Sequence, residues 1–223
     1  MEKGLEKKAK EVIIRAYETF PHNKTFVAWT GRKDSTVLLH LIRSIFDNKV
    51  PFPVMFNDST MEFEEIYQFI KKISKEWQLD LRIIRHDQKQ LSEFYHTKEL
   101  KRKKELSRLM KIHSIKRFVK ENDVAAFLVA IRWDEHPARS KEEYFSPRED
   151  HMRIHPILHF TEKDIWDYIR HYNVPYVKLY DQGYRSLGEK PFTRPVKDGQ
   201  GERAGLEYEK EQLMDKLRNM GYW

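Results

Sequence analysis

The sequence predicts an α/β fold built on a parallel, twisted sheet with helices on both faces. Two observations support this fold class. Short apolar runs alternate with amphipathic helical patterns from residue 5 to residue 131, as consecutive βαβ units do. The run Val124–Ile131 is apolar throughout, which is typical of a parallel strand covered on both faces. The length of 223 residues suits one such domain followed by an extension.

The elements of the first part of the chain can be placed in order. A helix is predicted over residues 5–19, because Leu5, Val12 and Tyr17 fall on one side at helical spacing. The segment Glu93–Asn122 is expected to form one or two helices. The other predicted elements are strands at Thr25–Trp29, Pro53–Asn57, Leu81–Ile84 and Val124–Ile131 and helices at Asp34–Phe46 and Met61–Trp77.

The composition changes after residue 131. Residues 132–152 are polar and contain Pro137 and Pro147, so irregular structure is expected there. Thr161 opens a capping-box-like signal for a helix that continues to about His171.

The remainder of the chain is predicted to be an extension. Residues 172–205 hold several loop-type prolines and glycines, and a last helix is expected at about Leu206–Met220, with Gly221 as its C-cap. We therefore expect an α/β domain over residues 1–171 and a mostly irregular and helical C-terminal extension over residues 172–223.

Composition excludes several functional classes. The chain has no cysteine, which excludes disulfides, thiolate catalysis and cysteine-ligated zinc or iron–sulfur clusters. The histidines show no metal-ligand spacing, so no protein-held metal site is expected. The N-terminus lacks an apolar signal region, and no run approaches the roughly 20 apolar residues of a membrane span. A cytoplasmic protein without membrane contact is therefore expected.

The charge balance favours an anionic partner. The formal net charge is +7, which suits a nucleotide or a nucleic acid. The basic run Lys101–Lys104 could contact RNA, but a solvated helix face is the favoured interpretation. Nucleic-acid binding is therefore considered unlikely, and a small anionic ligand is favoured.

A candidate phosphate loop joins the first predicted strand to the helix behind it. It reads Thr30-Gly31-Arg32-Lys33-Asp34-Ser35 and lies at a helix N-terminus, where unpaired N–H groups and the helix dipole favour an anion. Two hydroxyls and the Lys33 ammonium add donors. The Walker spacing is absent, so this is a different kind of phosphate loop.

The loop resembles the S-G-G-x-D-S motif of the ATP-pyrophosphatase superfamily, also called the PP-loop or adenine nucleotide alpha hydrolase-like superfamily. Thr30, Gly31, Asp34 and Ser35 fit the motif, whereas Arg32 occupies the place of its second glycine. The resemblance implies a Rossmann-like sheet and cleavage of ATP between its α and β phosphates. Arg32 could supply a side-chain donor, or it could mark a weak or disabled site.

Three further segments follow predicted strands or lie beyond them, and each contributes a candidate ligand. Asp58 lies at the carboxyl end of the second strand, where it could hold a ribose hydroxyl or orient Mg²⁺, or simply cap a helix. Arg132 and Arg139 flank an acidic pair after the fourth strand and could bind an oxyanion, unless they form a surface salt-bridge loop. Arg185 is the best third anion ligand.

These segments, in the same order, resemble a single family. It contains the phosphoadenosine phosphosulfate (PAPS) reductases, the small subunit of sulfate adenylyltransferase and the FAD synthetases. The resemblance covers about residues 26–196, and the tail from Glu202 to Trp223 also looks like the end of the sulfate adenylyltransferase subunit. The similar reductases use cysteines, but the corresponding positions near Gly188 carry Glu189 and Phe192.

The resemblance therefore implies adenylyl transfer from ATP with release of pyrophosphate, with sulfate as the first-choice acceptor. Lys33, Asp34, Arg132, Arg139 and Arg185 are assigned to catalysis. Thr30, Gly31, Arg32, Ser35 and Asp58 are assigned to ATP, with Mg²⁺ bridging the phosphates. A GTPase partner subunit is implied because adenylyl sulfate formation is uphill. Transfer to FMN and nucleotide binding without reductase chemistry are the alternatives. A tRNA-modifying enzyme is a weaker alternative, since no recognisable RNA-binding domain is appended.

Overall fold

The computed structural model describes residues 3–197 and 199–220. Within them, a six-stranded sheet has the order β3-β2-β1-β4-β6-β5. Strands β1 to β4 and β6 run parallel to one another, whereas the edge strand β5 pairs antiparallel with β6. The strands are β1 (Thr25–Ala28), β2 (Val54–Asp58), β3 (Leu81–Arg85), β4 (Ala126–Val129), β5 (Phe145–Pro147) and β6 (Met152–Ile154).

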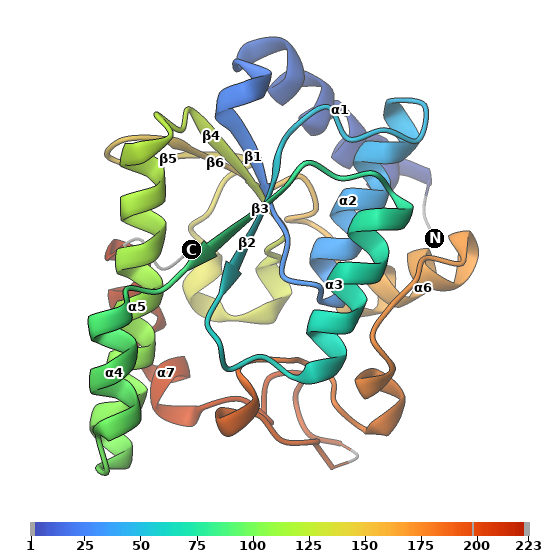
Figure 1. The fold of residues 1–223 in the computed structure, drawn as a ribbon. Coiled ribbons are helices and arrows are strands. Elements are labelled where there is room, and N and C mark those ends of the chain that lie inside the picture. Colours follow the sequence, from blue (N-terminus) through green and yellow to red (C-terminus); the bar gives the residue numbers. More distant parts are fainter. Residues whose placement is uncertain (1–2, 198, 221–223) are drawn as a thin grey trace.

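Helices cover both faces of the sheet, as predicted (Figure 1). The helices α1, α2, α3 and α6 lie on one side of the sheet, and α4 and α5 lie on the other. The α-helices are α1 (Lys3–Thr19), α2 (Lys33–Ile45), α3 (Glu64–Glu76), α4 (Gln88–His96), α5 (Leu100–Glu121), α6 (Glu162–Tyr172), α7 (Tyr208–Gln212) and α8 (Met214–Asn219).

Several sequence features explain where these helices begin and end. The Asp87 side chain accepts hydrogen bonds from the amides of Lys89 and Gln90 and so caps α4. This cap and the break near Thr97 make two helices of the segment 93–122. The capping box predicted at Thr161 is confirmed, because Thr161 and Asp164 exchange side-chain to backbone hydrogen bonds.

Two predictions of secondary structure are wrong. Residues 132–152 are not wholly irregular, because β5 and β6 extend the sheet beyond β4; each strand has three residues, too few for an alternating pattern to be detected. The last helix is not continuous, since it breaks at Leu213 between α7 and α8. The expected C-cap, Gly221, lies outside the described residues.

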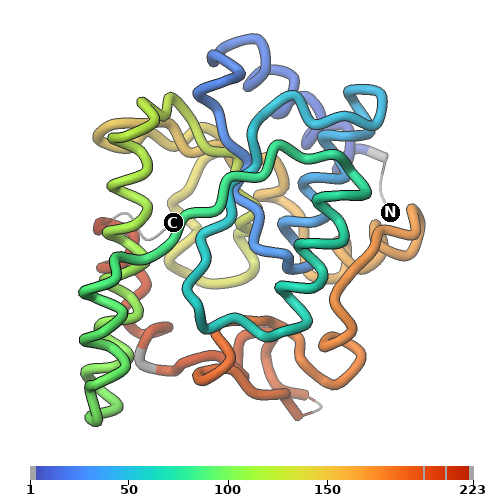
Figure 2. The backbone as a smooth tube through the Cα atoms, viewed as in Figure 1, coloured from blue at the N-terminus to red at the C-terminus, as the bar shows by residue number. Residues whose placement is uncertain are grey.

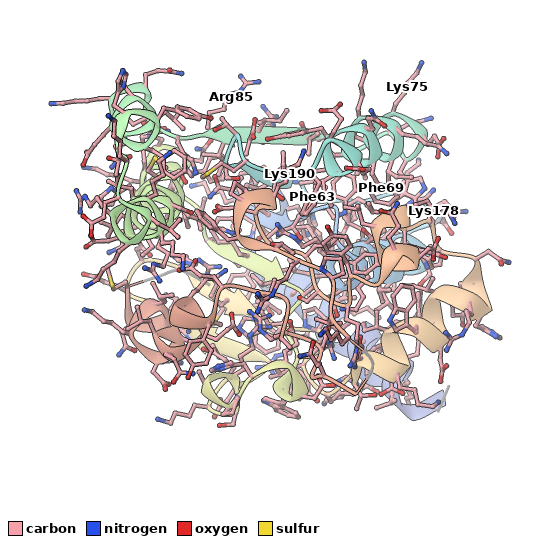
Figure 3. The ribbon with its side chains drawn as sticks, turned by 90° about the horizontal axis from the view of Figure 1, so that it is seen from below. Phe63, Phe69, Lys75, Arg85, Lys178 and Lys190 are labelled. Carbon is pink, nitrogen blue, oxygen red and sulfur yellow. The ribbon has the colours of Figure 1, made fainter. Side chains whose placement is uncertain are left out.

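The C-terminal extension crosses the edge of the sheet at which the parallel strands end. The tube in Figure 2 shows its path from α6 beneath the strand ends, and Figure 3 views the same edge from below. Leu179, Tyr180 and Leu187 of this segment are buried in the main core with Val27, Val54 and other sheet residues. The extension therefore packs over the strand ends, and the boundary at residue 171 stays a prediction. In the described part of the chain, no helix is long and apolar enough to cross a membrane.

Candidate active site

The phosphate loop turns sharply at Gly31 between β1 and α2. Gly31 has φ +69°, and a Cβ there would lie 3.0 Å from Ile70 Cγ1 of α3. A glycine is required because this backbone region and this close approach both disfavour a side chain. The next residue, Arg32, is the N-cap of α2 with φ −91°, an ordinary extended value. The missing second glycine of the motif therefore costs no backbone strain.

Hydroxyl groups hold the loop in shape. The Thr30 amide donates to Ser35 Oγ at 3.2 Å, and the two hydroxyls lie 3.1 Å apart. The Arg32 carbonyl accepts from Ser35 Oγ at 3.1 Å and from Thr36 Oγ1 at 2.9 Å. Trp29 Nε1 donates to the same Thr36 hydroxyl at 3.1 Å. These bonds fix the first turn of α2, whose N-terminus is the expected phosphate site.

The Arg32 side chain turns toward the segment that precedes α3, where Nη2 donates to Glu62 Oε2 at 2.8 Å. We expect Arg32→Gly to retain ATP binding within about threefold, because the Arg32 backbone is unstrained and the loop amides remain. Thermal-shift titration with ATP and Mg²⁺ measures this. Complete loss of binding would instead make the guanidinium an essential ligand, and new turnover absent from the wild type would mark the natural loop as disabled.

Lys33 is buried, and its donors are directed to the C-terminal extension. Its Nζ lies 2.5 Å from Glu202 Oε1 and 3.1 Å from the Arg185 carbonyl, with Asp34 Oδ2 at 3.3 Å. Its backbone amide donates to the Tyr180 hydroxyl at 3.1 Å. Burial alone would lower the pKa of Lys33, but the charges of Asp34 and Glu202 outweigh burial and the nearby Arg132 and raise the pKa. The neighbouring carboxylates therefore favour the charged form of Lys33.

Arg132 is fully buried and paired with three carboxylates. Its Nε donates to Asp34 Oδ1 at 2.7 Å, Nη1 to Asp134 Oδ1 at 2.5 Å, and Nη2 to both oxygens of Glu202 at 2.7 and 2.8 Å. Burial opposes the charge, but these carboxylates raise the pKa of Arg132 above its usual range. Glu202 is thus paired with both Lys33 and Arg132, the two cations predicted to bind the phosphate and the acceptor.

Glu202 is positioned as a phosphate would be, between Lys33 and Arg132. We expect Glu202→Gln to lower the Kd for pyrophosphate about tenfold, because removing one charge weakens its competition for both cations. Calorimetry measures the affinity. Glu76→Gln is the control, since Glu76 pairs with Lys72 at 3.8 Å on the exposed face of α3 and lies outside the phosphate loop and the wall of the neighbouring cavity. Weaker pyrophosphate binding in Glu202→Gln would mean that Glu202 stays in place and orients the cations.

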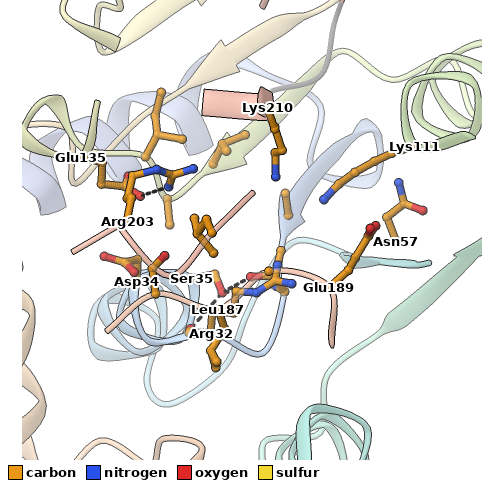
Figure 4. A pocket seen from close by; sticks show the side chains of 18 of the residues that line it. Arg32, Asp34, Ser35, Asn57, Lys111, Glu135, Leu187, Glu189, Arg203 and Lys210 are labelled. Atoms are coloured by element: carbon orange, nitrogen blue, oxygen red, sulfur yellow. Dashed lines mark hydrogen bonds and ion pairs between the residues drawn. The ribbon is translucent and has the colours of Figure 1, made fainter. Parts of the chain in front are cut away.

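A cavity of about 220 Å³ opens beside the loop, at the carboxyl ends of β1, β2 and β4 (Figure 4). Its walls come from these strand ends, from α5, from the segment 186–193 and from residues 203–214. Seven basic and four acidic side chains line it, an excess of cations that suits an anionic ligand. They are Arg32, Arg108, Lys111, Arg139, Arg153, Arg203, Lys210, Asp34, Glu135, Glu189 and Glu207.

The cavity brings together half of the predicted site residues. Thr30, Arg32, Asp34, Ser35 and Arg139 line it. Gly31, Lys33 and Arg132 lie behind this surface and shape the loop, as described above.

Arg139 shares the carboxylate of Glu135 with Arg203. Both arginines line the cavity; Arg139 Nη1 bonds Glu135 Oε2, and Arg203 Nη1 lies 3.3 Å from Glu135 Oε1. Burial lowers the pKa of Arg139, although Glu135 opposes the shift. Five lining cations are not among the predicted site residues: Arg108, Lys111, Arg153, Arg203 and Lys210. Arg203 follows Glu202 in the tail that resembles sulfate adenylyltransferase, which is the one signal available for it.

Asp58 and Arg185 are not brought into the cavity. The Asp58 carboxylate accepts from the Thr60 amide and from the Tyr67 hydroxyl, each at 2.8 Å, so it forms a turn instead of capping α3. Arg185 pairs with Glu162 at the first turn of α6, and its side chain is 43% exposed. Their roles as nucleotide and anion ligands stay predictions, which would require these side chains to move.

Comparison with known proteins defines the class. The model of the phosphoadenosine phosphosulfate reductase domain matches residues 24–195. The chain belongs to this family, within the PP-loop superfamily. Family and site together define a nucleotide-binding enzyme of the PP-loop class.

Individual relatives carry different names. An adenosine 5'-phosphosulfate reductase of Halalkalibacterium halodurans is 29% identical over 201 residues, 87% of this chain and 84% of that protein. A sulfate adenylyltransferase subunit 2 of Proteus mirabilis is 29% identical over 190 residues, 72% of this chain and 61% of that protein.

Solved structures confirm the predicted fold. A PAPS reductase from Candida auris superposes with a TM-score of 0.69 at 22% identity, covering 88% of this chain and 98% of that one. An FMN adenylyltransferase from Candida glabrata in complex with ATP gives 0.69 at 21% identity, covering 97% of this chain and 71% of that one.

Proposed function

We propose that this protein transfers the adenylyl group of ATP to an anionic acceptor and releases pyrophosphate. The observation that carries the proposal is the cationic cavity that begins at the phosphate loop of a chain without cysteine. Catalysis of this kind is mainly positioning and charge neutralisation. Both requirements can be met by the residues that line the cavity.

The cavity offers a place for each part of ATP. Ala28, Met55, Ile115 and Val129 give an apolar wall for the base, and Thr30, Ser35 and the α2 N-terminus face the phosphates. Mg²⁺ would neutralise phosphate charge. Since no cluster of three carboxylate or histidine side chains suited to a metal exists among the described residues, the metal would be held through the phosphate oxygens and water.

The structure of the segment 186–193 argues against reductase chemistry. Glu189 and Phe192 occupy the positions of the cysteines of the similar reductases. Glu189 Oε2 accepts from Ser107 Oγ at 2.5 Å and lines the cavity. Phe192 packs on an apolar cluster that contains Leu106 and Met110. Carboxylate and phenyl groups supply neither a thiolate nor cluster ligands.

Sulfate is the acceptor that we favour. It offers oxygen acceptors and two negative charges, so it needs converging cationic donors. Arg139 and Arg203 supply such donors at the cavity wall, whereas Arg132 and Lys33 become available once Glu202 is displaced. A GTPase partner subunit, which the resemblance implies, would drive the uphill step.

FMN is the second candidate acceptor, suggested by the FMN adenylyltransferase structures. A flavin ring needs an aromatic or apolar slot. Tyr180 lines the cavity, but Trp133 packs against Tyr144 and Tyr184 against Phe63, and neither lines it. The three loop aromatics therefore do not converge, which places FMN second. Nucleotide binding without turnover is the remaining alternative.

Pyrophosphate release from ATP and Mg²⁺ tests the proposal, with sulfate or FMN as acceptor and with or without a candidate GTPase subunit and GTP. Sulfate-dependent release is expected. Release that depends on FMN, together with quenching of flavin fluorescence on binding, would replace sulfate by FMN. ATP binding with no release under any condition would leave a nucleotide-binding protein.

A further inference from the structure

Arg153 of β6 is a buried cation that the proposed reaction does not use. It is 3% exposed, yet it lines the cavity. Its Nε donates to His151 Nε2 at 2.8 Å, and its guanidinium lies over the Phe127 ring at 5.0 Å. Its Nη2 has no hydrogen-bond partner among the described residues. The side chain is thus fixed in place with one donor unused.

The sheet register places Arg153 at the inner end of the cavity. Arg153 pairs with Phe127, whereas Val129, two residues closer to the carboxyl end of β4, also lines the cavity. Ile115 lies one helical turn beyond Lys111 on α5, and both side chains line the cavity. Met214 and Lys210 also line it, on either side of the break between α7 and α8. Phe127, over which the Arg153 guanidinium lies, packs with the lining residues Met55 and Ile115, so apolar side chains adjoin Arg153 at this end.

An unused donor on a buried cation is costly unless a ligand satisfies it. Burial lowers the pKa of Arg153 to about 9, and the charge of Arg148 contributes in the same direction. The charge of Glu142 opposes this shift, but the Glu142 carboxylate is already bonded to Arg148 and Arg218. In the part of the chain that the structure describes, the fold therefore buries the positive charge of Arg153 without a carboxylate bonded to its guanidinium.

We propose that Arg153, which lines the cavity, recognises the adenine ring by donating from its guanidinium to a ring nitrogen at the buried edge of the ring. Apolar side chains at the inner end cover the ring faces, and the one open donor demands one acceptor atom. An oxyanion would need several converging donors, which the cavity provides at Arg139 and Arg203 instead. This inference rests on the proposed binding of ATP in the cavity, and it makes Arg153 a residue that determines base specificity.

Binding of adenosine, which carries no phosphate, tests this role. Adenosine and pyrophosphate are each titrated by calorimetry into the wild type and Arg153→Met. The variant should bind adenosine about 10- to 100-fold more weakly and pyrophosphate unchanged. Its melting temperature without ligand should stay within about 2 °C of the wild type or rise, because a desolvated charge has been removed.

Arg148→Met is the matched control. Arg148 Nη2 donates to Glu142 Oε1 at 2.9 Å in the same buried group, and Arg148 does not line the cavity. This variant should melt at a lower temperature and bind adenosine as the wild type does. Adenosine analogues in which carbon replaces N1, N3 or N7 identify the contacted atom. One analogue should bind the wild type more weakly than adenosine does. The same analogue should bind Arg153→Met with the same affinity as adenosine.

The outcomes separate this inference from the proposed reaction. Unchanged adenosine affinity in Arg153→Met would overturn it, even if the enzyme releases pyrophosphate. Weaker pyrophosphate binding with unchanged adenosine binding would also overturn it, by making Arg153 an anion ligand. The wild type could also fail to release pyrophosphate while Arg153→Met still binds adenosine more weakly. That result would support the role of Arg153 and overturn the proposed reaction.

Discussion

Arg132→Met should destabilise the fold by about 3–5 kcal/mol, the cost typical of breaking a buried ion pair. Arg132 is fully buried and balances Asp34, Asp134 and Glu202, of which Asp34 and Glu202 are themselves largely buried. Without the guanidinium, these carboxylates lose a shared partner in a region of restricted solvent access. The free energy of unfolding from urea titrations measures the loss.

Arg185→Met is the matched control for this prediction. Arg185 also pairs with a carboxylate, Glu162, but its side chain is 43% exposed. Exposed pairs are typically worth about 0–1 kcal/mol, so a small change is expected. If Arg132→Met costs no more than Arg185→Met, the buried network around Arg132 does not stabilise the junction of loop and extension.

Gly31→Val should weaken ATP binding more than about 100-fold and lower the stability by roughly 2–4 kcal/mol. The backbone at Gly31 has φ +69°, and the new side chain would meet Ile70 and Ile66 of α3. The loop must then shift, which moves the Thr30 and Ser35 groups away from the α2 N-terminus. ATP titration and urea unfolding of the same samples measure both effects.

Gly199→Val is the control that separates the cost of backbone strain from the effect on ATP binding. Gly199 has φ +81°, but a Cβ there meets nothing within 4 Å. This variant carries a similar backbone cost without the collision, so it should lose about 1–2 kcal/mol and retain ATP binding. Equal ATP affinity in Gly31→Val and the wild type would show that the nucleotide does not use this loop.

The loop could be predicted from sequence because its chemistry is local. Thr30 to Ser35 join an apolar strand to an amphipathic helix, and both elements form as expected. The pairing of Arg132 with Asp34 spans 98 residues, and that of Lys33 with Glu202 spans 169. No periodicity or spacing reports such long-range contacts, so the sequence indicated useful cations but not what they touch.

The same limit applies to the rest of the site. Arg153 belongs to none of the elements predicted from the sequence, and its position at the inner end of the cavity depends on β6 joining β4. That strand has three residues and no alternating pattern long enough to predict. Arg203 and Lys210 depend on the path of the extension, which has little regular structure. Local patterns therefore predicted strands β1 to β4 and the phosphate loop, whereas tertiary packing determined the other walls of the cavity.

The central claim is that ATP is cleaved between its α and β phosphates with transfer of the adenylyl group. The most direct measurement follows ATP labelled separately at the α and γ phosphorus, incubated with enzyme, Mg²⁺ and sulfate, with and without a candidate GTPase subunit and GTP. The proposed function predicts γ label in pyrophosphate and α label in an adenylylated acceptor. Appearance of γ label as free phosphate with α label in ADP would contradict it, because the bond broken would then be the β–γ bond.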